Sequence, residues 1–197
     1  MIKERDGCVE LPNFLDPSLL EELIKFTNNN LESLTKKEFK NKENELINRI
    51  LNNVEFQKLT EKYSGKNYFV LSQNKTTNIN TKSSVIKSDT ELHYDKCYLN
   101  WVIPLILENN KEPGLIIFPD SRENVFKFIG LKLTVKLLGS PFVLRSKIFM
   151  SLLGGRKIEY RVNHAYIFDG YKSLHGVVRH FDDGNRCVIT INFRMED

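Results

Sequence analysis

The sequence predicts a mainly β domain preceded by helices, and three observations lead to this fold class. After Gly65, short runs rich in β-branched and aromatic residues alternate with turn residues, which is typical of a sandwich or barrel of short strands. Before Gly65, apolar residues recur at helical spacing. Apolar residues make up 41% of the 197 residues and aromatic residues 11%, which is enough to build the core of one domain.

The first third of the chain predicts a short strand followed by helices. The segment CVELPNFLDPSLLEELIKFTNNN is typical of a strand, a turn and a helix, in which Asp16 is a suitable N-cap and Pro17 fits the first helical position. The segment NKENELINRILNNVEFQKLTEKYSG continues the helical pattern and ends at Gly65. We therefore expect a single domain over residues 1–197, with a helical part over residues 1–65.

Six apolar runs after Gly65 predict the strands of the β region. In chain order they are NYFVLSQ, YLNWVIPLIL, GLIIFP, AYIFDG, HGVV and RCVITINF. The turn signals SDTE, ENNKEPG and DDGN separate several of them. Strands this short must pack into a closed arrangement to bury their faces, so residues far apart in sequence are expected to meet.

Residues 121–160 differ from the rest of the chain in charge and in pattern. They hold eight basic residues and two acidic ones, an excess of +6 where the whole chain carries +4. The segment is also very apolar, and its periodicity is compatible with a pair of helices or with a long hairpin. It predicts either an extra cover over one end of the barrel, with Lys and Arg reaching water, or a lid or docking surface for an anionic or lipid-like substrate or a membrane surface.

The stretch ELHYDKCYLN places an imidazole and a carboxylate two residues apart, just before an apolar run. Residues i and i+2 of a strand point to the same side, so His93 and Asp95 can bind one metal ion. Two ligands make a weak site, and His175 at the start of a late strand is the preferred third. His180 can exchange roles with His175, whereas His164 is expected to be structural or to face the substrate.

Two imidazoles and one carboxylate on one face are typical of the facial triad of non-haem Fe(II) oxygenases. Such iron has open positions for a bidentate 2-oxo acid and for O2. The distal carboxylate of the 2-oxo acid needs a cation, and Arg186, eleven residues after His175, is the candidate. Thr190 would face the same side and donate a hydroxyl; Arg179 and Arg194 are alternative cations.

Further polar residues lie near the predicted metal pair. Tyr98 and Asn100 follow it directly and are candidates to hydrogen-bond the 2-oxo acid. Gln73 and Asn78, on the preceding segment, are weaker candidates. For these four a purely structural role is an equally good interpretation, and Trp101 is expected to belong to the core.

Several pieces of the chain resemble the Fe(II)- and 2-oxoglutarate-dependent oxygenases, in particular their prolyl-hydroxylase-like and phytanoyl-hydroxylase-like branches. These pieces are HYD, PGLIIFPDS, AYIFDGYKSLHGV and GNRCVITINF, and the resemblance leaves out residues 121–160. It implies a double-stranded β-helix (a jelly roll, as in cupins), iron bound by His93, Asp95 and His175, and 2-oxoglutarate bound by Arg186. It also implies conversion of 2-oxoglutarate and O2 to succinate and CO2. Halogenating relatives lack the carboxylate at the position of Asp95, so hydroxylation is the expected outcome.

A second interpretation is a cupin-like metal-binding protein, such as a sensor or an isomerase, that does not turn over 2-oxoglutarate. Such a protein would not need Arg186. Neither interpretation identifies the substrate, because one scaffold carries many of them. We expect a small-molecule, lipid-like or peptidyl substrate, with an anionic one among the alternatives.

The net charge, the cysteines and the lengths of the apolar runs indicate which partners and which location to expect. A net charge of +4 and a pI near 8.8 are too small to indicate a nucleic-acid partner, and none is expected. Three cysteines without a CxxC pair indicate free thiols in a reducing compartment. No secretory signal pattern or apolar stretch of membrane-spanning length appears, so a cytoplasmic location is expected. The oligomeric state is not indicated.

Overall fold

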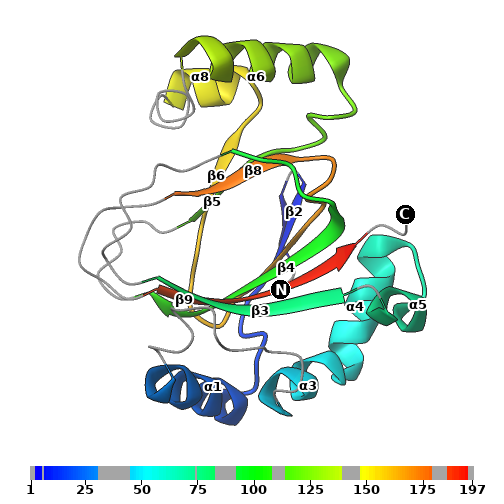
Figure 1. Cartoon of the computed structure of the whole chain (residues 1–197), viewed down its shortest axis with the longest axis vertical. Coiled ribbons are helices and arrows are strands. Elements are labelled where there is room, and N and C mark those ends of the chain that lie inside the picture. The colour runs from blue at the N-terminus through cyan, green and yellow to red at the C-terminus, as the bar shows by residue number, and fades with distance from the viewer. Residues whose placement is uncertain are drawn as a thin grey trace.

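Two antiparallel sheets lie face to face between two layers of helices (Figure 1). The computed structural model describes residues 3–5, 7–30, 45–73, 75–82, 92–107, 114–138, 147–178 and 186–194. The larger sheet has six strands in the order β1-β2-β7-β4-β9-β3, and the smaller has three in the order β6-β5-β8. The strands are β1 (Lys3–Arg5), β2 (Cys8–Leu11), β3 (Lys75–Lys82), β4 (Cys97–Leu107), β5 (Gly114–Phe118), β6 (Arg156–Glu159), β7 (Ala165–Phe168), β8 (Leu174–Val178) and β9 (Arg186–Arg194).

The chain passes back and forth between the two sheets, which closes the β region around an inner apolar cluster. Strands β4, β7 and β9 belong to the large sheet, while β5 and β8, which alternate with them along the chain, belong to the small one. The inner cluster consists of Cys8, Val102, Leu115, Ile117, Tyr160, Tyr166, Phe168 and Val188. The predicted sandwich of short strands is therefore confirmed, and five of the six predicted runs form strands.

Among the described residues, four helices cover the other face of the large sheet (Figure 1). They are α1 (Pro17–Asn29), α3 (Glu45–Leu51), α4 (Val54–Ser64) and α5 (Tyr68–Gln73). Because side chains alternate along a strand, β4 sends Val102 inward and Trp101 outward to these helices. Trp101 is fully buried there, with its ring 4.5 Å from that of Phe56 and 5.3 Å from that of Phe14, which confirms its place in the core.

The ends of α1 and α4 follow the predicted signals. The Asp16 carboxylate accepts a hydrogen bond of 2.9 Å from the Ser18 N–H, and Pro17 is the first helical residue. Gly65 ends α4 with a left-handed φ of 68°, and its N–H donates to the Glu61 carbonyl at 2.9 Å. These caps satisfy backbone groups that the first and last helical turns leave unpaired.

The run NYFVLSQ forms helix α5, so the expectation of a strand there was wrong. Its β-rich composition is overridden by local contacts with α4 and the preceding turn. The Tyr68 N–H donates to the Glu61 carboxylate at 2.8 Å, and the Phe69 N–H donates to the Asn67 side chain at 2.9 Å. The Tyr68 hydroxyl also donates to the Leu51 carbonyl at 3.0 Å. Gln73 consequently lies exposed on a helix, outside the β region.

The described parts of the 121–160 segment, residues 121–138 and 147–160, form two helices and an edge strand rather than a long hairpin. Helices α6 (Val125–Leu138) and α8 (Lys147–Leu152) form the second helical layer, over the small sheet, which β6 completes at one edge (Figure 1). Leu131 of α6 is buried in a cluster with Ile116, Phe118 and Leu174 of that sheet. The segment is therefore packed onto the domain through one face of α6.

Substituting Phe56→Ala should lower the free energy of unfolding by about 3–5 kcal/mol, because it removes a fully buried ring between the helices and Trp101. The matched control is Phe69→Ala, which truncates an exposed ring and should cost about 0.5 kcal/mol or less. Urea denaturation followed by tryptophan fluorescence measures both. A loss below about 1 kcal/mol for Phe56→Ala would contradict this packing.

Candidate metal centre

His93 and His175 lie opposite each other on neighbouring backbones. The His93 N–H donates to the His175 carbonyl at 2.9 Å, and the His175 N–H donates to the His93 carbonyl at 3.0 Å. Directly opposed residues of an antiparallel pair project their side chains to the same face. The two imidazole rings accordingly lie 4.6 Å apart, centroid to centroid. The backbone pairing, rather than sequence proximity, brings the two rings together.

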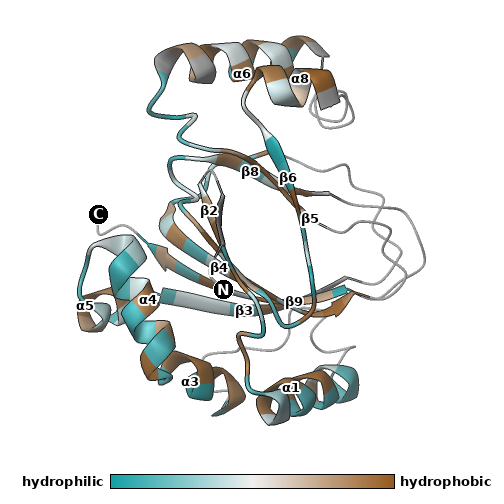
Figure 2. Cartoon of the chain, turned by 180° about the vertical axis from the view of Figure 1, so that it is seen from behind, coloured by the Kyte–Doolittle hydropathy of each residue, from teal (hydrophilic) through white to brown (hydrophobic). Residues whose placement is uncertain are grey.

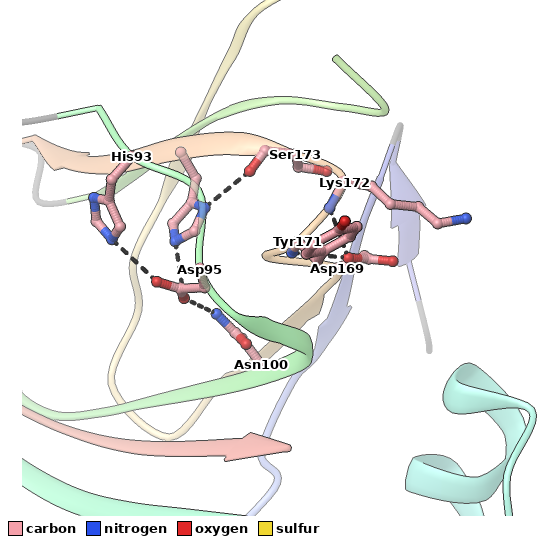
Figure 3. Close-up of polar contacts among 8 residues, drawn as sticks. His93, Asp95, Asn100, Asp169, Tyr171, Lys172 and Ser173 are labelled. Atoms are coloured by element: carbon pink, nitrogen blue, oxygen red, sulfur yellow. Dashed lines mark hydrogen bonds and ion pairs between the residues drawn. The ribbon is translucent and has the colours of Figure 1, made fainter. Parts of the chain in front are cut away.

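Asp95 completes the cluster (Figure 3). Its N–H donates to the Gly170 carbonyl at 2.9 Å, which attaches the segment to the turn before β8. Its two carboxylate oxygens lie 3.4 Å from His93 Nε2 and 3.3 Å from His175 Nε2. One ligand atom from each residue lies within 4.8 Å of the others, so the three predicted ligands are close enough to bind one metal ion.

The buried His175 ring is held in one orientation. Its Nδ1 lies 3.0 Å from the Ser173 carbonyl, which can only accept, so Nδ1 carries the proton. Nε2 is then the nitrogen that faces Asp95, and it is the one that can ligate a metal once it carries no proton. Such a hydrogen bond behind the ligating nitrogen fixes the tautomer of metal-binding histidines. The His93 ring is about half exposed, so the cluster is open to solvent on that side.

Asp95 is ionised in this environment. Burial raises the pKa of its carboxyl, but hydrogen bonds with His175 and His93 outweigh that effect and hold the pKa well below its usual value. The buried Asn100 adds to this, because its Nδ2 donates to Asp95 Oδ2 (Figure 3). An anionic carboxylate held in a fixed rotamer is the form that binds a divalent cation.

The turn between β7 and β8 is shaped to fit against Asp95 and Asn100. Asp169 accepts hydrogen bonds of 2.9 Å from the N–H groups of Tyr171 and Lys172, which fixes the turn (Figure 3). A Cβ atom on Gly170 would lie 2.5 Å from Asn100 Nδ2 and 3.1 Å from Asp95 Cβ. Only glycine leaves room for the Asn100 amide to reach the carboxylate.

Tyr94, between the two predicted ligands, ties the cluster to residues 121–122. Its hydroxyl lies 3.0 Å from Ser121 Oγ, which accepts a hydrogen bond of 2.9 Å from the backbone N–H of Leu174. The Arg122 guanidinium lies 4.4 Å from the Tyr94 ring and 4.0 Å from the Tyr171 ring, between the two. No sequence pattern indicated these contacts, because the residues that make them come from three separate segments.

Arg186 and Thr190 lie on the same inner face of β9, as their spacing predicted. Val188, between them in this alternation, belongs to the inner cluster, whereas Cys187 and Ile189 pack outward. The Arg186 guanidinium lies 5.4 Å from the Tyr160 ring. Burial raises the pKa of Tyr160 to about 12, so a neutral phenol stands beside the guanidinium. Tyr160 was not singled out from the sequence, since its segment falls in the atypical 121–160 region.

The side chains of Asn100 and Tyr98 lie on opposite faces of the large sheet. Asn100 faces inward and contacts Asp95, so it positions a ligand, a role that its spacing alone did not indicate. Tyr98 lies at a register shift between Cys97 and Leu99. It packs against the apolar core between the large sheet and the helices that cover its other face. The Lys66 ammonium lies 4.8 Å from its ring. The structure therefore does not bring Tyr98 to the inner face beside Asn100.

The alternative candidates lie away from the cluster or outside the described residues. His164 Nδ1 lies 3.0 Å from Glu10 Oε1, which is a structural pairing between two strand ends. Arg194 is exposed at the far end of β9, and Asn78 is exposed opposite Thr190 on β3. His180 and Arg179 lie outside the described residues.

Solved structures share this fold at low sequence identity. HygX from Streptomyces hygroscopicus, solved with nickel and 2-oxoglutarate bound, aligns at a TM-score of 0.67 and 10% identity over 96% of this chain and 83% of that one. The non-haem α-ketoglutarate-dependent epimerase SnoN from nogalamycin biosynthesis aligns at 0.63 and 12% identity, over 96% and 79%. A prolyl-4-hydroxylase from Pseudomonas putida aligns at 0.59 and 12% identity, over 98% and 89%.

The chain has the fold of the non-haem 2-oxoglutarate-dependent enzymes. The expected jelly roll is thereby confirmed. No family model and no curated protein sequence matches the chain.

Substituting Asn100→Ala should weaken Mn(II) binding about 10- to 100-fold, because Asp95 loses the amide that fixes its carboxylate. Asn48→Ala on α3, an exposed position far from the cluster, is the control and should bind as the parent protein does. Isothermal titration calorimetry measures both affinities. Equal affinity in the two variants would show that the Asn100 contact does not support the site.

Proposed function

We propose that this protein is an Fe(II)- and 2-oxoglutarate-dependent dioxygenase that hydroxylates its substrate and releases succinate and CO2. The cluster of His93, Asp95 and His175 carries this proposal. The shared fold supports it, because the same architecture holds nickel and 2-oxoglutarate in HygX.

The three side chains fit Fe(II) in donor type and in protonation. Two imidazole nitrogens and one carboxylate oxygen form the set that non-haem Fe(II) oxygenases use. The Ser173 carbonyl leaves His175 Nε2 free to ligate, and the low pKa of Asp95 supplies the anionic ligand. When bound, Fe(II) would supply the activation of O2 that couples 2-oxoglutarate decarboxylation to substrate oxidation.

Arg186 and Thr190 are proposed to bind the distal carboxylate of 2-oxoglutarate. Both lie on the inner face of β9, which runs from Arg186 toward Asn192, the partner of Asn100 across the sheet. The guanidinium can pair with a carboxylate through two parallel N–H donors, and the Thr190 hydroxyl can add a third. Tyr160, neutral and beside the guanidinium, limits water around that pair.

Hydroxylation is the proposed outcome because Asp95 occupies the third ligand position. SnoN, an epimerase, has the same fold, so the fold by itself is compatible with other oxidative outcomes. The substrate is proposed to be a small-molecule, lipid-like or peptidyl compound. A cytoplasmic location is proposed from the three cysteines, which are all free and buried.

Anaerobic addition of Fe(II) and 2-oxoglutarate to the apo-protein should produce a weak visible charge-transfer band that neither produces alone. His175→Ala should abolish this band, since it removes one ligand nitrogen. His164→Ala is the matched control, because it removes a histidine that pairs with the carboxylate of Glu10, outside the cluster, and it should leave the band unchanged. Metal binding without a band in the parent protein would favour a cupin-like protein that does not use 2-oxoglutarate.

Arg186→Ala should raise the dissociation constant for 2-oxoglutarate about 10- to 100-fold, because a buried carboxylate loses its charged partner. Arg49→Ala on α3 removes the same charge far from the inner face and should have no effect. Titration of the charge-transfer band with 2-oxoglutarate measures both constants. An unchanged constant for Arg186→Ala would show that the cation lies elsewhere.

A further inference from the structure

In the part of the chain that the structure describes, the outer face of α6 and α8 carries six large apolar side chains that are exposed. Along α6 they recur every three or four residues and lie on one side of the helix, and two more on α8 are four residues apart. We call this set the outer apolar face; it consists of Phe126, Ile129, Leu133, Leu137, Ile148 and Leu152. Phe126 is 89% exposed and Leu152 76%, so these are not partly buried core residues. Figure 2 shows the brown of apolar residues along both helices, at the end of the molecule opposite α1 and α3.

The opposite side of α6 packs against the small sheet. Leu131 is buried against the small sheet, and Val135 and Phe128 are partly buried on the same side. A surface helix normally exposes polar residues on its other side. Here α6 is apolar on both sides, and the second apolar stripe contributes nothing to the core. Contiguous exposed apolar surface of this kind marks an interaction site.

The charged residues within helices α6 and α8 are all lysines. Lys132 and Lys136 are exposed on α6, along one flank of the apolar stripe. From residue 124 to residue 158 the sequence contains no acidic residue and seven basic ones: Lys127, Lys132, Lys136, Arg145, Lys147, Arg156 and Lys157. The partner of this surface must therefore accept large apolar side chains and carry negative charge beside them.

We propose that α6 and α8 dock on the surface of an anionic lipid bilayer. The outer apolar face would enter the boundary between headgroups and acyl chains, while the lysines contact the anionic headgroups. The helices would lie flat, since α6 has 14 residues and a spanning helix needs about 20. Among the described residues no helix is long and apolar enough to cross a membrane. A second copy of the chain is a poorer partner, because a symmetric contact would bring together two surfaces whose charged residues on α6 and α8 are all lysines.

Helix α6, which carries this docking surface, contacts the segment that holds His93 and Asp95. The Phe128 ring on the inner side of α6 lies 6.2 Å from the ring of Tyr94, which stands between His93 and Asp95. Docking would therefore hold the cluster near the bilayer, where lipid-borne substrates reside. The docking itself does not depend on the proposed oxygenase activity and is tested without it.

Flotation of the full chain with vesicles tests the proposal. Phosphatidylcholine vesicles containing phosphatidylglycerol should bind the protein, and vesicles of phosphatidylcholine alone should bind it much less, with binding that falls as salt is added. Phe126→Ser combined with Leu137→Ser, and separately Lys132→Glu combined with Lys136→Glu, should each reduce binding about tenfold or more. All four positions are exposed, so circular dichroism should show an unchanged fold.

The matched control is Phe69→Ser combined with Val70→Ser. It removes two exposed apolar side chains from α5, in the helical layer on the other face of the β region, and should bind vesicles as the parent protein does. Equal binding of the α6 variants and the parent protein would overturn the proposal. So would a dimer, seen by light scattering, that Phe126→Ser with Leu137→Ser dissociates in a protein that ignores vesicles. The outer apolar face would then be a contact between copies.

Discussion

The paired backbone hydrogen bonds between His93 and His175 are the constraint on which the rest of the site depends. They connect the segment before β4, in the large sheet, to β8, in the small one. A third bond, from the Asp95 N–H to the Gly170 carbonyl, connects the same segment to the turn before β8. Because these bonds are made by main-chain atoms, they set the spacing of the backbone positions that carry the two imidazoles and the carboxylate. The Ser173 carbonyl and the Asn100 amide then orient the side chains. The candidate metal site therefore forms where main-chain hydrogen bonds connect the two sheets.

Electrostatics then determine what the cluster can bind. A partly buried carboxylate is costly to keep ionised, and here the two imidazoles and the Asn100 amide offset that cost. The two imidazoles, the carboxylate and the Asn100 amide bring several hydrogen-bonding atoms close together. A divalent cation between these groups would replace the contacts of the two rings with the carboxylate by direct ligation.

The sequence predicted that His93, Asp95 and His175 would meet, and the structure brings these side chains together. His93 and Asp95 are two residues apart at a strand edge, and Arg186 and Thr190 share a face through strand alternation. The role of Asn100 could not be predicted, because it depends on how closely the β7–β8 turn approaches β4. Tyr98 was misplaced in orientation by a register shift that no residue pattern marks. The helix α5 was missed because a polar partner seven residues away, Glu61, decided its first turn. Residues 121–160 stayed ambiguous because α6 is apolar on both sides, which removes the periodic contrast that distinguishes a helix.

The close fit of Gly170 under the Asn100 amide has a consequence for sequence change. The space beside Asp95 is shared by two positions 70 residues apart, and neither can grow unless the other shrinks or the turn moves. Substitutions at positions 100 and 170 should therefore be non-additive in their effect on metal affinity, with each one conditional on the other. In laboratory evolution of this protein, a substitution at one of the two positions would therefore be retained only together with a compatible residue at the other.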